Sequence, residues 1–400
     1  MSRFVHVLQG VYKLESEWSA VRAFVEYKKS QSILCICNDA SFDISVNNGV
    51  YGFPHNGSQF TKSFWRSIAA VSCIGQNDLV FLYRTSGYNV GCGRINGVFR
   101  IYSSSGTPAI YYDPESPDLQ LSSAGGADCK TRLLFERLIE GLYFIGEDYE
   151  IVKCLESRDL WGFRHPAVMN IGAARKKSFV VLTHKQTLLM IDLLKRYGKN
   201  VPQHQGSLPA RERANYYDGL VGEEDRFKID ETFLLSHSAA TSDEAFMYSY
   251  LVYGLRHPHS TIHAEIIDDL TSINRDFLVD LAMQNFGEMT SNILLEVVIS
   301  VHLQEELDVV LLNNDENVMF ILEIKQAAVD SAAVTQVQKY LDLMKTIFPQ
   351  KRIFANIIGG CPPSIAPTIE SSYANRIRLA YYSVDASTGK RRMAIVGLPG

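Results

Sequence analysis

The chain lacks any long hydrophobic run. Within its 400 residues no stretch approaches the roughly eighteen consecutive apolar residues that a membrane-spanning helix needs. Residues 1–10 also lack the charged, apolar and small-residue segments of a secretory signal peptide. We therefore expect a protein that neither spans a membrane nor is secreted, and that works in the cytoplasm.

A disulfide framework is missing as well. The seven cysteines are odd in number and lie at the irregular positions 35, 37, 73, 92, 129, 154 and 361. Secreted domains that are held together by disulfides usually carry an even number of cysteines at regular spacings. Reduced thiols in a cytoplasmic protein are the better interpretation.

The composition has no excess of charge of one sign. The net charge is −5, with 46% hydrophobic and 21% charged residues, which are ordinary values for a globular protein. An acidic total argues against a protein that coats nucleic acid along its whole surface, although a local basic channel stays compatible with it. No internal repeat or low-complexity stretch is present, and 400 residues are too many for one core.

Changes in composition divide the chain into an N-terminal and a C-terminal domain. Short apolar strands separated by turns predict an α+β domain with a small twisted sheet or barrel, interrupted by a helix at 58–68 and followed by a strand at 71–74. Gly, Pro, Gln and alternating charges then indicate a linker. The predicted divisions are an N-terminal extension at 1–29, the first domain at 30–196, the linker at 197–235 and the second domain at 236–400.

The second domain shows the order of elements that is typical of an α/β fold. Two helices are followed by three strands, a helix and a further strand. These elements are expected at 243–255, 261–286, 293–301, 307–312, 318–325, 332–348 and 352–358.

Three charged residues interrupt two apolar strands of this second domain. Asp308 lies in the first strand, and Glu323 and Lys325 end the next, where period-two geometry places both on one face. A buried charge costs several kcal/mol unless it is paired or binds a metal. Two carboxylates on adjacent strands can hold Mg²⁺, and a lysine beside them can orient or deprotonate a water. A structural Asp–Lys ion pair is the alternative interpretation.

The helix that follows adds two polar residues to this pattern. Gln336 and Tyr340 are one helical turn apart, so both side chains share a face. Together with the strands they favour hydrolysis of a phosphodiester bond over a simple ion pair. The candidate catalytic residues are therefore Asp308, Glu323, Lys325, Gln336 and Tyr340.

The stretch from Leu307 to Tyr340 resembles the catalytic domain of NucS-like mismatch endonucleases and related PD-(D/E)XK restriction-type nucleases. The resemblance implies a restriction-endonuclease-like fold with a central mixed sheet, with Asp308 and Glu323 as metal ligands. The family usually adds a Glu on an upstream helix. Here Asp276 occupies that place as a third candidate ligand, while Glu265 and Glu296 remain rivals for the role.

The N-terminal domain carries a second resemblance, in the runs CICNDASFDISVNNGVYGFPHNGSQFTKSFW and AVSCIGQNDLVFLYRTSGYNVGCGRI and in the later SRDLWGFRHPAVMNIG. They are similar to the YTH and EVE branch of the PUA-like superfamily, whose members bind a modified base in an aromatic cage. The resemblance implies base-binding roles for Tyr51, Asn38, Asp39, Tyr88 and Trp161. Alternatively, these aromatic residues simply belong to the core.

Taken together, the two resemblances imply a modification-dependent DNA endonuclease that acts like a type IV restriction enzyme. The expected cofactor is Mg²⁺, with Mn²⁺ as a substitute, and the expected partner is DNA that carries a modified base. A homodimer is compatible with the resemblance, although no residue in the sequence requires one. The alternatives are a DNA-repair endonuclease that recognises damaged or mismatched DNA, and a non-catalytic nucleic-acid-binding protein.

Overall fold

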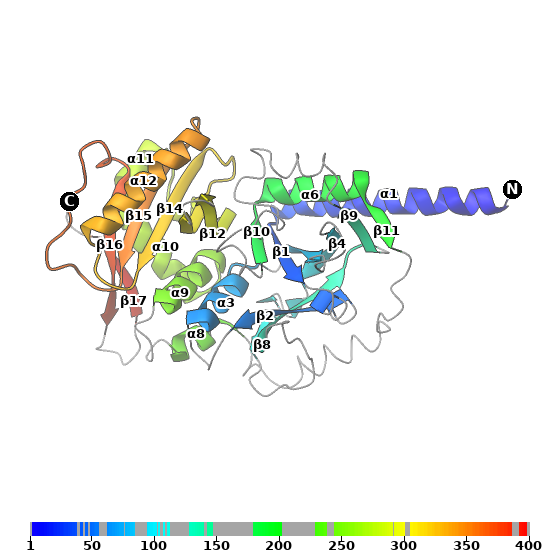
Figure 1. Cartoon of the computed structure of the whole chain (residues 1–400), viewed down its shortest axis with the longest axis horizontal. Coiled ribbons are helices and arrows are strands. Elements are labelled where there is room, and N and C mark those ends of the chain that lie inside the picture. Colours follow the sequence, from blue (N-terminus) through cyan, green and yellow to red (C-terminus); the bar gives the residue numbers. More distant parts are fainter. Residues whose placement is uncertain are drawn as a thin grey trace. The chain divides into compact units, whose positions relative to one another are not determined.

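The computed structural model divides the chain into two compact units, each of which combines helices with a sheet (Figure 1). Unit 1 contains residues 1–55 and 74–228, and unit 2 contains residues 56–73 and 229–400. The structure describes residues 2–37, 41–42, 45–46, 49–55, 62–75, 77–84, 94–101, 103–104, 107–108, 110–112, 128–139, 142–146, 179–201, 229–237, 244–290, 292–300, 305–385 and 392–397.

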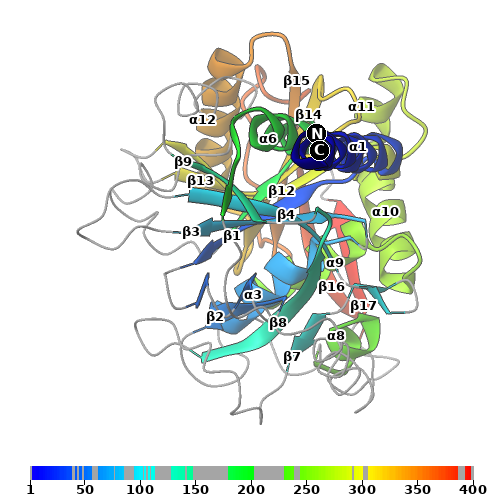
Figure 2. The same ribbon diagram turned by 90° about the vertical axis from the view of Figure 1, so that its right-hand side faces the viewer.

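Unit 1 is built on a curled sheet. Its strands follow the order β10-β1-β3-β4-β8-β2, with β9 and β11 attached beside β4 and β7 beside β8. The long strand β8 pairs with β4 at one end and with β2 and β7 along the rest, so the sheet bends along it (Figure 2). The strands are β1 (Ser32–Cys37), β2 (Val50–His55), β3 (Leu79–Arg84), β4 (Arg94–Ile101), β7 (Ile110–Tyr112), β8 (Asp128–Arg137), β9 (Leu142–Gly146), β10 (Phe179–Leu182) and β11 (Lys199–Val201), besides the short hairpin of β5 (Ser103–Ser104) and β6 (Thr107–Pro108).

Two helices pack together in unit 1, α1 (Ser2–Lys28) and α6 (His184–Tyr197). Thr183 starts α6 with a capping box, in which its side chain accepts a hydrogen bond from the backbone of Gln186 and the Gln186 side chain accepts one from the backbone of Thr183. Trp18 of α1 and Met190 of α6 are buried in one apolar cluster with strands β1, β3 and β10. The predicted N-terminal extension is therefore a helix that contributes to the core of unit 1.

Unit 2 contains a mixed sheet of six strands in the order β12-β13-β14-β15-β16-β17. Neighbouring strands are antiparallel from β12 to β14, parallel from β14 to β16, and antiparallel between β16 and β17. A central mixed sheet in this part of the chain was predicted, although its last two strands were not. The strands are β12 (Asn292–Ser300), β13 (Glu305–Leu312), β14 (Val318–Lys325), β15 (Arg352–Gly359), β16 (Ile377–Asp385) and β17 (Arg392–Gly397).

Helices cover both faces of this sheet. Helix α12 lies on one side of β14 and β15, whereas α10 and α11 lie on the other (Figure 2). The long helix predicted at 261–286 is divided at Asn274, which ends α10 and begins α11; its side-chain amide donates a hydrogen bond to the carbonyl of Leu270 at 2.8 Å. The helical elements are α8 (Glu231–His237), α9 (Glu244–Arg256), α10 (Thr261–Ile273), α11 (Arg275–Asp280), the 3₁₀ helix η5 (Phe286–Met289) and α12 (Ser331–Ile347).

Helix α3 (Lys62–Ser72) belongs to unit 2, although the chain runs through it between two strands of unit 1. Its Trp65 is fully buried and meets Phe246 of α9 edge to face, with ring centroids 4.7 Å apart. The sequence prediction differed here, because it placed 58–74 in the first domain and a strand at 71–74. The buried aromatic face of α3 finds its partner on α9, which lies far along the chain.

No helix in the part of the chain that the structure describes is long and apolar enough to cross a membrane.

Candidate active site

The candidate site forms where β13 and β14 stop pairing. Their register runs from Leu312 opposite Met319 to Val309 opposite Leu322. Asp308 and Glu323 occupy the next step. Here the Asp308 side chain takes the place of a ladder partner, because its Oδ2 accepts a hydrogen bond from the backbone N–H of Ile324 at 2.8 Å. The two predicted carboxylates therefore lie on adjacent strands at one level of the sheet.

Glu323 is a buried carboxyl group, with only 3% of the residue exposed. One oxygen, Oε1, accepts a hydrogen bond from Lys325 Nζ at 2.7 Å, whereas Oε2 is buried without a hydrogen-bond partner. Burial raises the pKa of Glu323, and the positive charge of Lys325 opposes that effect. A buried carboxylate oxygen without a partner is costly in an apolar interior and well placed to bind a cation.

Lys325 connects the strand to α12. Besides Glu323, its Nζ donates to Gln336 Oε1 at 2.9 Å, and Gln336 Nε2 donates in turn to the hydroxyl of Tyr340. The Asp330 side chain caps the start of α12 by accepting from the backbone N–H of Ala333 at 2.8 Å, which fixes where the helix begins. The structure thus joins Glu323, Lys325, Gln336 and Tyr340 in one hydrogen-bonded chain.

Asp308 is strongly influenced by its surroundings. Burial raises its pKa well above the ordinary value, and the nearby negative charges of Glu323 and Glu244 raise it further. The Ile324 N–H and the charge of Lys325 act in the opposite direction. Tyr248 of α9 fixes the local backbone, since its hydroxyl donates to the carbonyl oxygen of Asp308 at 3.1 Å.

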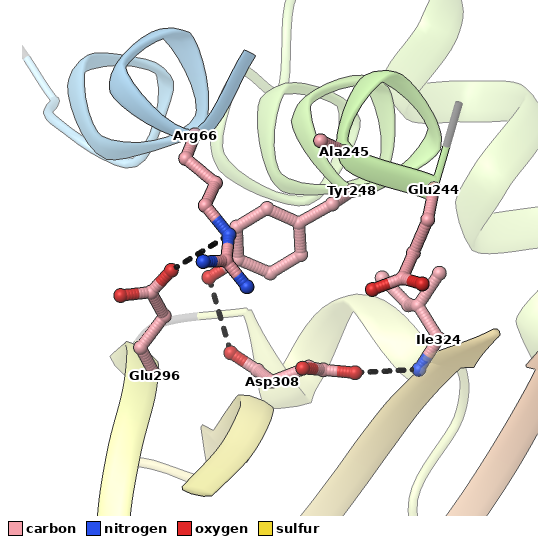
Figure 3. Close-up of a pocket in the computed structure, with 7 residues that line it drawn as sticks. All are labelled: Arg66, Glu244, Ala245, Tyr248, Glu296, Asp308 and Ile324. Atoms are coloured by element: carbon pink, nitrogen blue, oxygen red, sulfur yellow. Dashed lines mark hydrogen bonds and ion pairs between the residues drawn. The ribbon is translucent and has the colours of Figure 1, made fainter. Parts of the chain in front are cut away.

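Asp308 lies at the bottom of a small, partly open pocket of about 10 Å³, roughly the room that one water molecule needs. Helices α3 and α9 stand over one side of it; Arg66 and Glu244 reach down into the pocket, whereas the Glu296 carboxylate points up toward Arg66 (Figure 3). The pocket is lined by Arg66, Glu244, Ala245, Tyr248, Glu296, Asp308 and Ile324.

Glu296 lies on β12 at the level of Asp308. The pairs on either side are Leu295 with Val309 and Val297 with Leu307, so Glu296 and Asp308 share the step between them. The backbone of Glu296 adopts a φ of 46°, in the left-handed region that non-glycine residues rarely occupy. Such local strain persists where the surrounding structure enforces it, and it often marks a functional position.

The predicted third ligand, Asp276, lies away from this pocket. Its side chain is 85% exposed on α11 and pairs with Arg378 of β16 at 3.6 Å. Of its two rivals, Glu265 lies on α10 and does not line the pocket, whereas Glu296 does. Glu244, the first residue of α9, also lines the pocket and was not considered from the sequence. The sequence signal that could have indicated Glu244 is an acidic residue in the first turn of a helix. Such residues are common, because they stabilise the helix whether or not they have a functional role.

The donor set suits Mg²⁺ better than a metal that requires a complete protein cage. Within the described residues, no group of three or more His, Cys, Asp or Glu side chains is arranged to hold a metal ion. Mg²⁺ does not need one, because it keeps several waters and is commonly bound by one or two carboxylates together with phosphate oxygens. The buried, unpartnered Oε2 of Glu323 next to Asp308 fits such a site.

The described part of the predicted base-binding site is Tyr51 on β2. Only 3% of Tyr51 is exposed, its hydroxyl donates to the carbonyl of Ile36 at 3.1 Å, and its ring meets Phe53 edge to face at 5.0 Å. Asn38, Asp39, Tyr88 and Trp161 lie outside the described residues. In this state Tyr51 packs as a core residue, and a base could stack on it only after its neighbours moved.

No family model matches the chain, and no curated protein matches it significantly in sequence.

Proposed function

We propose that unit 2 is a Mg²⁺-dependent endonuclease that hydrolyses phosphodiester bonds in DNA. The observation that carries this proposal is the pair of carboxyl groups at the end of the β13–β14 ladder, Asp308 and Glu323, of which Glu323 keeps a buried oxygen without a partner. A structural ion pair with Lys325 would satisfy only one oxygen of Glu323. A second buried carboxyl group beside it would then make the structure less stable.

Asp308 and Glu323 would hold the metal, which supplies charge stabilisation at the phosphate and lowers the pKa of a bound water. Before binding, Lys325 neutralises Glu323 at 2.7 Å. From its place between Glu323 and Gln336, the Lys325 ammonium group would orient the attacking water. Gln336 keeps Lys325 in place from α12, and Tyr340 holds Gln336, so these two are positioning residues.

A modified base is proposed as the signal that directs cleavage, and unit 1 as its reader. This part of the proposal rests on the resemblance of residues 35–95 and 157–172 to YTH and EVE domains, whose members stack a flipped base between aromatic side chains. Within that stretch, helix α3 belongs to unit 2. The curled α+β sheet of unit 1 is compatible with it. The cytoplasm, where DNA and Mg²⁺ are both present, is the proposed location.

The experiment is to incubate the whole protein with matched DNA substrates that contain cytosine, modified cytosine, adenine or N6-methyladenine. Each is tested with Mg²⁺, with Mn²⁺ and with EDTA. We expect cleavage with either metal, none with EDTA, and faster cleavage of one modified substrate. Equal cleavage of modified and unmodified DNA would support the repair-type alternative, especially if mismatched DNA is preferred. Absence of metal-dependent cleavage from every substrate would overturn the proposal.

A further inference from the structure

We infer that Arg66 is the residue of unit 2 that binds the phosphate next to the cleaved bond, and that Glu296 holds its side chain until DNA arrives. This inference rests on the proposed nuclease function. It concerns a residue that the catalytic motif does not contain, contributed by a helix from a distant part of the sequence.

Helix α3 is fixed firmly enough to carry such a residue. Trp65, next to Arg66, is buried against Phe246, and its carbonyl accepts a hydrogen bond from Ser249 Oγ of α9 at 2.5 Å. At the end of α3, Arg256 Nε donates to the carbonyl of Cys73 at 3.0 Å, and His257 Nε2 lies 2.8 Å from the carbonyl of Ser72. Arg66 therefore starts from a rigid base, while its own side chain remains 52% exposed.

The guanidinium group of Arg66 lies over a concentration of negative charge. It reaches down from α3 into the pocket toward Glu296 and Asp308, opposite Glu244 (Figure 3). Among the described residues, Arg66 forms an ion pair with Glu296, in which Nε lies 3.6 Å from Oε1. This distance is long for a hydrogen bond. A pair of this length with a half-exposed arginine contributes little to stability, so holding α3 in place is a poor explanation for it.

Phosphate binding explains the arrangement better. A guanidinium group offers donors in a fixed planar fork that matches two phosphate oxygens, and it stays charged at any physiological pH. Of the residues that line the pocket, Arg66 is the cationic one. A phosphodiester bound beside Asp308 would compete with Glu296 for Arg66, and the same contact would strengthen as charge builds up on the phosphate during hydrolysis.

The test compares Arg66→Gln, Arg66→Lys and Glu296→Gln in the full chain with a matched control, Arg100→Gln. Arg100 has the same 52% side-chain exposure and pairs with Glu136 in unit 1. Affinity for a short DNA duplex is measured in EDTA over a range of salt concentrations, and the single-turnover cleavage rate is measured in Mg²⁺. A thermal melt of each variant accompanies both measurements.

We expect Arg66→Gln to slow cleavage on the order of 100-fold. The slope of log affinity against log salt concentration should fall by the amount that corresponds to about one phosphate contact. Arg66→Lys should recover part of the rate, since it keeps the charge but loses the fork. Glu296→Gln should raise affinity in EDTA by releasing Arg66, whereas a purely structural pair would make Glu296→Gln and Arg66→Gln behave alike.

These measurements distinguish a failure of the role of Arg66 from a failure of the nuclease function. If the wild-type protein cleaves DNA but Arg66→Gln keeps the wild-type rate and salt dependence, Arg66 is not a phosphate ligand and the nuclease function still stands. If Arg66→Gln melts at a much lower temperature than Arg100→Gln, the more conservative Arg66→Lys replaces it in the comparison. A folded Arg66→Lys variant with the wild-type cleavage rate and unchanged salt dependence would also show that the planar guanidinium group is not needed to bind the phosphate. If the wild-type protein neither cleaves nor binds DNA, the proposed function and the inference fall together.

Discussion

Asp308 and Glu323 each carry a carboxyl group whose pKa is raised, chiefly because protein surrounds it. At low pH both groups are protonated in the folded and the unfolded chain, so the raised pKa costs no stability. As the pH rises above the ordinary value, the unfolded chain ionises first and the folded state becomes relatively less stable. A bound Mg²⁺ would reverse this effect, because it stabilises the ionised carboxylates. The metal-free protein should therefore lose stability between acidic and neutral pH.

Replacing Asp308 with Asn tests that relation directly. Asn keeps an oxygen that can accept from the Ile324 N–H but cannot ionise. In EDTA at neutral pH we expect Asp308→Asn to melt above the wild type by about 2–4 °C, the shift that 1 kcal/mol produces in a unit of this size. The gain should shrink toward pH 4, and Mg²⁺ should raise the melting temperature of the wild type only. An equal gain at both pH values would show that ionisation of Asp308 is not the cause.

At the scale of elements, the helix that brings an acidic residue into the pocket is α9, whereas the sequence predicts α11. Glu244 lines the pocket and raises the pKa of Asp308, whereas Asp276 is exposed beside Arg378. Glu244 is therefore the better candidate for a third acid that acts on the metal directly or through a water.

Glu244→Gln should raise the Mg²⁺ concentration needed for half-maximal cleavage about tenfold, while Asp276→Asn leaves it unchanged. One lost charge near a divalent ion, worth roughly 1.4 kcal/mol, accounts for a factor of that size. The measurement is a Mg²⁺ titration of the cleavage rate for both variants. If Asp276→Asn shifts the titration and Glu244→Gln does not, α11 carries the third acid in a conformation different from this one.

The elements near the site were predictable because their sequence patterns are local. Apolar strands that contain Asp308 or Glu323, and a helix with Gln336 and Tyr340 one turn apart, can be recognised from short windows. Packing between distant segments could not be predicted in this way. Nothing within residues 58–74 indicates that Trp65 packs on α9. Likewise, the hydrogen bond from the Ile324 N–H to the Asp308 side chain depends on where the β13–β14 ladder ends.

At the scale of the whole molecule, unit 1 is the proposed reader of a modified base and unit 2 is the proposed nuclease. Unit 1 is described only in part around the predicted base-binding site, and Tyr51 is the residue of that site that the structure places. Its burial makes two roles distinguishable. A core tyrosine affects stability, while a cage wall affects the preference for modified DNA.

Tyr51→Ala separates these roles, and Tyr51→Phe is its matched control because it removes only the hydroxyl bonded to Ile36. As a cage wall, Tyr51 should contribute about 1–3 kcal/mol of binding to modified DNA alone. As a core residue, its loss should cost about 3–5 kcal/mol of stability. A binding titration on modified and unmodified DNA, beside a thermal melt, decides between them. An early melt with an unchanged preference would remove Tyr51 from the proposed reader.

The central claim is that Glu323 and its partners hold a metal for phosphodiester hydrolysis, and the most direct test is the Mg²⁺-dependent cleavage rate of Glu323→Gln. Gln preserves the size of the side chain and an acceptor for Lys325 but cannot supply the anionic oxygen. The rate should fall by at least two to three orders of magnitude, roughly 3–4 kcal/mol of barrier. Folding and DNA affinity in EDTA should remain, and Glu306→Gln, on the same strand as Asp308 but outside the pocket, should cleave like the wild type. Wild-type cleavage by Glu323→Gln with unchanged Mg²⁺ dependence would contradict the account.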